Sequence, residues 1–568
     1  MTETTSDATR SRTAIDTIAD AHLDAELALD PIAATSIGAP GFETELTDYS
    51  PSANAERSAL RRKTLAALDD AEPVDDVDRV TTAALRERLS VEEELYAAGT
   101  DESSLNVIAS PVQSLRSVYD LMAKKTADDW ATVATRLRKT PAAMDAYVES
   151  LRTALQRGDV SARRQVERCV DQARGFAAAD GFFAELASGA RLGDAPEGAD
   201  ELPGALQRDL NEAAGVAASA FRRLADVLTD ELLPAAPVPD GVGRDRYALW
   251  SRYFLGARID LDETYAWGLD ELERIETEMR QIADRIKPGA SIAEAIDVLD
   301  ADPERRLEGT DALRAWMQQK SDAAVEALSQ SHFDIPQPIR RLECCIAPTH
   351  EGGIYYTGPS EDFSRPGRMW WSVPKDVTWF GTWRETTTVY HEGVPGHHLQ
   401  VGQTVYRSEL LNRWRRMGCW VSGHGEGWAL YAERLMADLG FLDDPADRFG
   451  MLDAQAMRAA RVALDIGVHL GLEAPAQLGG GTWDADKAWT FLTSHVNMAE
   501  GFLRFELDRY LGWPGQAPAY KVGERLWLSI RDELRQRQGD AFDLTAFHRR
   551  ALDIGSVGLD VLRDTLLR

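Results

Sequence analysis

Apolar residues recur at intervals of three and four over long stretches of this chain, and this spacing limits the fold more than any other feature. Between Pro203 and Pro234, apolar side chains fall at Leu206, Leu210, Ala213, Ala217, Phe221, Leu224, Leu228 and Leu232. A second stretch covers residues 265–286 and stops at Pro288-Gly289, and residues 55–98 repeat the pattern with more charge. Such periodicity is typical of amphipathic helices bounded by prolines. Strand-like segments are scarce, so we predict an all-α fold.

The breaks between these helical stretches are short. Residues 234–243, with the sequence PAAPVPDGVG, form the clearest one, and three glycines at 479–481 mark a loop. Neither break separates segments of different composition. We therefore expect residues 11–568 to form a single large helical domain and residues 1–10 to be disordered. Two aromatic runs, at 354–356 and 369–373, are separated by Gly, Pro and Ser, and they predict a small β-ribbon.

The chain is strongly acidic, with 63 Lys and Arg against 93 Asp and Glu and a net charge of −30. This charge argues against binding to nucleic acid or to an anionic membrane surface. No apolar run reaches the roughly 18 residues of a membrane-spanning helix, and the first residues lack the features of a secretory signal. The four cysteines form no C-x-x-C pair, which argues against a disulfide framework or a thiolate zinc site. We expect a reduced, cytoplasmic setting.

One stretch has recognisable chemistry: TWRETTTVYHEGVPGHHLQVGQ, residues 382–403. Three of the chain's ten histidines, His391, His397 and His398, lie within eight positions, and Glu392 follows the first of them. A His-Glu pair followed by further histidine is typical of zinc hydrolases, in which two imidazoles hold the metal and the carboxylate activates water. The sequence therefore predicts a zinc site with Glu392 as the general base.

The spacing of these histidines does not suit a regular helix. In H-E-x-x-H the second histidine comes four residues after the first, but here that position is Pro395. His397 would lie about 120° off the face of His391, and His398 would lie about 10.5 Å away along the axis. Because Pro395 has no N–H and the flanking glycines tolerate unusual backbone angles, a bulged or broken turn could return His397 to His391. We favour His397 as the second ligand and keep His398 as the alternative.

A third ligand is expected from GHGEGWALYAERLMADLG, residues 423–440. Glu426 lies between two glycines at the start of a predicted helix and precedes an apolar stripe. A carboxylate in the first turn is also favoured by the helix dipole alone, and that is the alternative role for Glu426. Glu433 is the competing carboxylate, for which we favour a place behind the ligands or on the surface.

These segments resemble the bacterial family known as domain of unknown function 885. The resemblance rests on YHEGVPGHHLQ at 390–400, EGWALYAE at 426–433, RAARVALDIGVH at 458–469 and RYLGWPGQAPAYKVG at 509–523, with a weaker match in YYTGPSEDFSRPG at 355–367. The motifs of the metal site thus fall within residues 346–568. That family is similar to the zinc metallocarboxypeptidases of the carboxypeptidase Taq type, which take two histidines from one helix and a glutamate from the next.

The resemblance implies an all-α fold with a deep cleft and a β-ribbon near the site. It carries over a set of metal ligands and a general base: His391, one of His397 and His398, Glu426, and Glu392 as the base. The Pro-Gly insertion departs from the peptidase pattern. Related helical peptidases use a tyrosine from a late region of the chain as the second donor to the oxyanion, which implies Tyr520 as the first candidate and Tyr510 as the second.

Three further side chains are candidates for substrate binding: Arg461, His469 and Arg509. Either arginine could hold a substrate carboxylate through a two-pronged contact. The alternative for Arg461 is an ion pair with Asp465, four residues later on the same helix face.

The leading hypothesis is a zinc-dependent peptidase that hydrolyses amide bonds of short peptides, and a carboxypeptidase is one form of it. Its partners are a zinc ion and a peptide, and a homodimer is one option for its oligomeric state. Two histidines and a carboxylate also bind iron in non-haem oxygenases, which gives a second hypothesis. The third is a non-catalytic helical protein that binds peptides or other ligands and retains the same fold.

Overall fold

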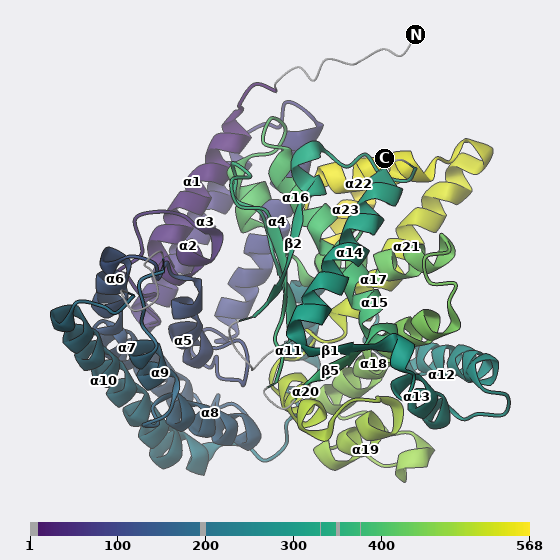
Figure 1. Ribbon diagram of the computed structural model, residues 1–568. Helices are drawn as coiled ribbons and strands as arrows, with labels where there is room; N and C mark the ends of the chain where they lie inside the picture. The colour runs from purple at the N-terminus through teal and green to yellow at the C-terminus, as the bar shows by residue number, and fades with distance from the viewer. Residues whose placement is uncertain (1–9, 194–199, 330, 348–352, 375–376) are drawn as a thin grey trace.

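The protein is built almost entirely of helices packed around a small β-sheet (Figure 1). The structure, a computed structural model, describes residues 10–193, 200–329, 331–347, 353–374 and 377–568. The first eleven helices are α1 (Ala14–Leu29), α2 (Pro31–Ile37), α3 (Pro51–Asp69), α4 (Asp76–Ala97), α5 (Pro111–Leu121), α6 (Ala127–Leu137), α7 (Thr140–Gln156), α8 (Arg163–Phe176), α9 (Phe182–Ser188), α10 (Gly204–Val227) and α11 (Arg244–Leu255). The predicted all-α class is confirmed.

The second half of the chain contains the helices that surround the candidate site. They are α12 (Leu261–Ile286), α13 (Ile292–Asp300), α14 (Gly309–Ser329), α15 (Thr382–Glu392), α16 (His397–Tyr406), α17 (Ser422–Asp438), α18 (Pro445–Leu470), α19 (Ala485–His495), α20 (Glu500–Gly512), α21 (Ala519–Gln538), α22 (Leu544–Ile554) and α23 (Leu559–Leu566). Helix α18 packs along both α12 and α15, and α17 packs along α21. These three contacts bring together motifs that lie far apart in the sequence.

Five short strands form two sheets. Strand β1 (Arg306–Glu308) pairs antiparallel with β5 (Trp379–Gly381). In the other sheet, β4 (Gly367–Trp371) lies between β2 (Leu342–Ile346), its parallel neighbour, and β3 (Ile354–Thr357), its antiparallel neighbour. The predicted β-ribbon is present as β3 and β4, and β3 forms one edge of this sheet.

Buried apolar side chains form three clusters. The largest spans the N-terminal helices and the helices from α11 onward. A second lies among α5 to α10, which occupy the lower left of Figure 1, and a third joins α14 to the sheet. Each cluster follows the apolar stripes of its helices, because burial of these stripes is the main source of helix stability in a protein.

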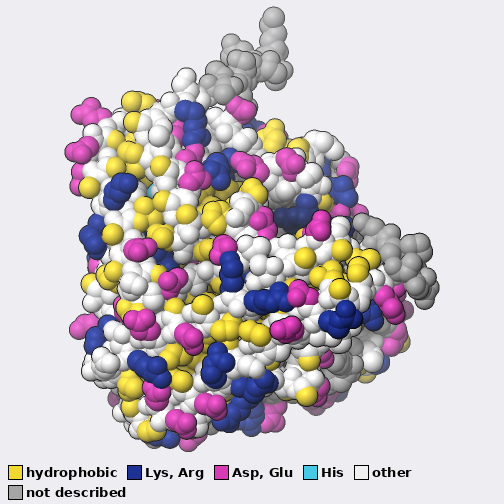
Figure 2. All heavy atoms as spheres, turned by 90° about the vertical axis from the view of Figure 1, so that its left-hand side faces the viewer, with side chains coloured by type: hydrophobic (Ala, Val, Ile, Leu, Met, Phe, Trp, Pro, Cys, Tyr) yellow, Lys and Arg dark blue, Asp and Glu magenta, His cyan; other side chains and the backbone are white. Residues whose placement is uncertain are grey.

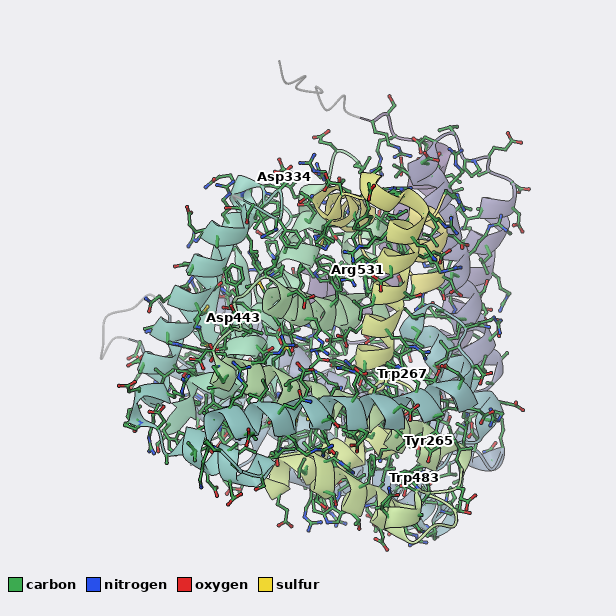
Figure 3. All side chains as sticks on the ribbon, turned by 90° about the vertical axis from the view of Figure 1, so that its right-hand side faces the viewer. Tyr265, Trp267, Asp334, Asp443, Trp483 and Arg531 are labelled. Carbon is green, nitrogen blue, oxygen red and sulfur yellow. The ribbon has the colours of Figure 1, made fainter. Side chains whose placement is uncertain are left out.

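The surface is covered by charged side chains of both signs. Figure 2 shows basic and acidic groups interspersed over the face formed by the N-terminal half. Figure 3 shows the opposite face, which α12 crosses; there Trp483 and Tyr265 lie side by side, and the Trp483 Nε1–H donates to the Tyr265 hydroxyl at 2.9 Å.

Several local expectations need correction. Residues 55–98 form two helices, α3 and α4, because the intervening segment contains Pro73 and several acidic residues. Strand β2 was not predicted. The expected disorder of residues 1–9 lies outside the described residues, but Arg10 is ordered enough to pair with Asp16 and Asp75 at 2.6 Å.

The crossing of α17 and α21 requires glycine on both helices. A Cβ atom added to Gly427 would lie 2.4 Å from the carbonyl carbon of Gly523, a distance far below van der Waals contact. We expect Gly427→Ala to lower the free energy of unfolding by about 1–3 kcal/mol, because the added methyl group forces two backbones apart. Chemical denaturation followed by circular dichroism measures this change.

Gly215→Ala is the matched control. Gly215 also lies inside a helix, α10, but a Cβ atom there would meet nothing within 4 Å. Alanine should leave the free energy of unfolding unchanged or raise it by up to about 1 kcal/mol. Equal effects of the two substitutions would contradict the close helix crossing.

Candidate metal centre

Two histidines meet where the chain interrupts a helix. Helix α15 ends at Glu392 and α16 begins at His397, and the Gly396 N–H donates to the Tyr390 carbonyl at 3.1 Å. A Cβ atom at Gly396 would lie 1.9 Å from the His391 carbonyl oxygen, so only glycine allows this tight return. The imidazole rings of His391 and His397 consequently lie 4.9 Å apart, nearly perpendicular to each other.

Glu426 faces both imidazoles. Its Oε2 atom lies 3.4 Å from His391 Nε2 and 3.4 Å from His397 Nε2. These distances exceed the roughly 2.7–2.9 Å of a charged hydrogen bond. They match the separation of about 3.3–3.4 Å between two donor atoms of a tetrahedral zinc ion with bonds of about 2.0–2.1 Å. The chemistry of these three donor groups suits zinc, and both separations from the Glu426 oxygen fit a tetrahedral ion.

Glu433 orients the first histidine from behind. The Glu433 Oε1 atom accepts a hydrogen bond from His391 Nδ1 at 2.7 Å, and its Oε2 accepts one from the Thr387 hydroxyl at 2.8 Å. A proton on Nδ1 leaves the Nε2 lone pair free toward Glu426. This is the arrangement by which carboxylates fix the tautomer and orientation of metal-binding histidines.

The electrostatic environment of His391 favours a cation. Burial lowers the pKa of His391, but the neighbouring carboxylates of Glu426 and Glu433 outweigh it and raise the pKa to about 9. Burial likewise opposes ionisation of Glu426, yet both imidazoles hold its pKa well below the usual range. Carboxylates that stabilise an added proton at His391 would also stabilise a metal ion in its place.

Glu392 is the carboxylate closest to the two histidines in sequence, and its role differs from that of Glu426. One ligand atom each of His391, Glu392 and His397 lies within 4.8 Å of the others, so Glu392 faces the same space. Burial raises its pKa, and its Oε2 atom is buried without a hydrogen-bond partner among the described residues. Glu426, whose Oε2 atom is equidistant from both imidazoles, is the carboxylate that could hold a metal ion together with them, and the unpartnered oxygen of Glu392 could accept a proton.

His398 points away from this centre. Its Nε2 atom donates to the Ile339 carbonyl at 2.6 Å, and its Nδ1 atom lies 2.9 Å from the Tyr356 hydroxyl. Both ring nitrogens are thus engaged, and burial lowers the pKa of His398 to about 4, so the ring is neutral. The geometry therefore brings His397, not His398, to His391 and Glu426.

A cleft of about 680 Å³ opens onto these residues. Strand β3 lines one part of it, and α15, α18 and α20 line others. The sequence-predicted residues that line it are His391, Glu392, His397, Glu426, Arg461, Arg509 and Tyr520. The Tyr520 hydroxyl lies 3.5 Å from Arg509 Nη2. Of the two tyrosines predicted as oxyanion donors, Tyr520 is the one that lines the cleft.

Two predicted residues have structural contacts instead. The Tyr510 hydroxyl donates to Glu506 Oε2 and accepts a hydrogen bond from Arg461 Nε at 2.6 Å. His469 is buried, and its Nε2 atom donates to the Tyr510 carbonyl at 2.9 Å. Neither side chain lines the cleft.

The predicted ion pair between Arg461 and Asp465 is absent from the described contacts. Arg461 Nη2 instead binds Glu506 Oε2 at 2.8 Å. Asp465 accepts from the Tyr247 hydroxyl at 2.6 Å and from the Gly515 N–H at 3.0 Å. The counterion of Arg461 is therefore Glu506 on α20, and not Asp465 on its own helix, α18.

Three residues of the site went unrecognised in the sequence. Arg458 lines the cleft on α18, one turn before Arg461. Trp420 lines it too, is 49% exposed, and lies with its ring 6.1 Å from that of His397. Tyr356 reaches the site from β3. Arg458 and Tyr356 lie in segments that carry the family resemblance, but their spacing in the sequence does not indicate that they reach the site.

Fold and site together define a large helical protein with a candidate metal centre in a cleft. The chain belongs to the family described as "Bacterial protein of unknown function (DUF885)", which matches residues 31–566. No protein with a curated description is a match in sequence. Within the ranges that the structure covers, no helix is both long and apolar enough to span a lipid bilayer.

Two solved structures share the fold. One is described as "the putative lipoprotein from Colwellia psychrerythraea"; it has a TM-score of 0.81 and 22% sequence identity over 98% of this chain and 99% of that one. The other is described as "a putative lipoprotein of unknown function from Shewanella oneidensis", with a TM-score of 0.72 and 17% identity over 98% of this chain and 100% of that one. At these identities the likeness concerns the fold alone.

Proposed function

We propose that this protein is a zinc-dependent peptidase that hydrolyses amide bonds of short peptides. One observation carries the proposal: two imidazole nitrogens each lie 3.4 Å from one carboxylate oxygen of Glu426, while the buried carboxylate of Glu392 faces the same space with an unpartnered oxygen. The motif resemblance to carboxypeptidase Taq-type enzymes supports the same chemistry. His391, His397 and Glu426 would hold the zinc ion.

Residues of the chain would have separate roles in the reaction. When bound, zinc supplies Lewis-acid chemistry, polarising a carbonyl group and acidifying water. Glu392 takes a proton from the attacking water while the water oxygen bonds to the scissile carbonyl carbon. Glu392 then returns that proton to the amine nitrogen as the C–N bond breaks. The Tyr520 hydroxyl, at the wall of the cleft, donates a hydrogen bond to the carbonyl oxygen as negative charge develops on it.

Metal content is the direct test. Protein purified without chelator from cells grown with zinc should contain about one zinc ion per chain, because three preformed ligands bind it. Mass spectrometry of the metals measures this ratio, and removal of zinc with a chelator should abolish hydrolysis of a library of short fluorogenic peptides. Zinc added back should restore it.

Three outcomes would contradict the proposal in different ways. Less than about a tenth of an equivalent of zinc would remove the metal centre itself. Iron in place of zinc would favour the oxygenase hypothesis. A full equivalent of zinc with no turnover across the library would favour the non-catalytic binding protein.

A further inference from the structure

One part of the cleft is lined by arginines. Arg458, Arg461 and Arg509 all line it. Glu506 is the acidic partner of two of them: its Oε2 binds Arg461 Nη2 at 2.8 Å and its Oε1 binds Arg509 Nη1 at 3.1 Å. Arg461 and Arg509 therefore share one carboxylate, and Arg458 makes no ion pair with it.

Of these three arginines, Arg458 is the one that forms no ion pair with a described residue. Its guanidinium has five N–H groups, and its hydrogen bond within the described residues runs from Nη1 to the Ala454 carbonyl at 3.0 Å. Its nitrogens form no ion pair within 4.0 Å of a described carboxylate, and its buried Nε atom has no hydrogen-bond partner among the described residues. A buried donor left unpaired is costly unless a ligand or water satisfies it.

Arg458 is also close to the proposed chemistry. It lies on α18, which packs along α15, the helix that ends at His391 and Glu392. Arg458, His391 and Glu392 all line the same cleft. A group bound by Arg458 would thus lie in the cleft that holds the proposed scissile bond.

We propose that Arg458, supported by Arg461 and Arg509, binds a carboxylate group of the peptide substrate. A guanidinium binds a carboxylate through two parallel N–H···O bonds, which matches the unpaired donors of Arg458. The inference rests on the proposed peptidase function and narrows its substrates to peptides that place a carboxylate near the cleaved bond. The free C-terminus of a short peptide and an acidic side chain both supply that group.

Binding to the chelator-treated protein tests this inference without hydrolysis. The probes are three N-acetylated tripeptides compared by calorimetry: trialanine with a free C-terminus, its C-terminal amide, and an amide whose last residue is glutamate. The free acid should bind about 10- to 100-fold more tightly than the trialanine amide, the usual effect of one charged hydrogen-bonded pair. If the glutamate amide binds as tightly as the free acid, a side chain serves as the source. Equal binding of all three probes would overturn the proposal.

Variants locate the effect on the protein. Arg458→Gln should remove most of the preference for the acid over the amide, and Arg458→Lys, which keeps the charge, should retain part of it. Arg448→Gln is the matched control, because Arg448 lies on the same helix but pairs with Glu278 at 2.6 Å outside the cleft. An unchanged preference in Arg458→Gln would refute the role of Arg458.

Hydrolysis by the zinc-loaded protein distinguishes failure of the carboxylate site from failure of the proposed peptidase function. Arg458→Gln should raise KM for the acid substrate while kcat changes less, because the interaction precedes the reaction. If the probes bind with the expected preference but none is cleaved, the peptidase function fails and the carboxylate site stands. If all are cleaved and bound alike, the function stands and the carboxylate site fails.

Discussion

Replacing Glu392 with glutamine is expected to abolish peptide hydrolysis while leaving zinc bound. The side chain keeps its size, so the buried position stays filled, but an amide cannot take a proton from water or return one to the leaving amine. General acid–base catalysis of this kind contributes about 10²- to 10⁴-fold in rate. The kcat/KM of the variant on the best library peptide should therefore fall by at least about 100-fold, with zinc per chain unchanged.

The control for this variant is Glu304→Gln. Glu304 is exposed and lies next to β1, outside the residues that line the cleft. Its substitution changes the net charge by the same amount and should leave kcat/KM as in the unaltered protein. Retained hydrolysis in Glu392→Gln would show that another group moves the proton, and loss of zinc would show that Glu392 is a ligand instead.

Two carboxylates of α17, Glu426 and Glu433, are expected to differ in their effect on zinc affinity. Glu426→Gln removes a charged oxygen that faces both imidazoles at 3.4 Å, and we expect affinity to fall by more than about 100-fold. Glu433→Gln removes only the partner of His391 Nδ1, and loss of such a supporting carboxylate costs about 10- to 100-fold. Competition with a chromophoric chelator measures both values on the metal-depleted protein.

Asp438→Asn serves as the control on the same helix. Asp438 is exposed at the C-terminal end of α17, so its loss changes charge without touching the centre. Circular dichroism should show the same helix content in all three variants. A larger loss of affinity from Glu433→Gln than from Glu426→Gln would reverse the assignment of ligand and supporting carboxylate.

Much of the fold follows from local patterns. The apolar spacing of residues 265–286 predicts α12 to within a few residues, and the stop at Pro288-Gly289 coincides with its end. The helix over 203–234 continues beyond α10 as a turn of π-helix at Leu228–Leu232, which alters its geometry but not its course. Strand β2 could not be predicted in this way, because its parallel partner β4 lies more than twenty residues away.

Only part of the candidate site could likewise be predicted from the sequence. The residue types and the helix break follow from the sequence, since Pro395 and Gly396 exclude a regular turn. The choice between Glu426 and Glu433, and the presence of Arg458 and Glu506 in one cleft wall, depend on how α15, α17, α18 and α20 pack. Side chains brought together by helix packing over such distances leave no periodicity that a single sequence can display.

The adjacent imidazoles of His397 and His398 have different contacts. The first faces the proposed ion, whereas the second ties strand β3, through Tyr356, to the backbone at Ile339. The doublet therefore offers no spare ligand. In a relative of this chain, a change at the second histidine should loosen the rim of the cleft, and a change at the first should weaken binding of the proposed ion.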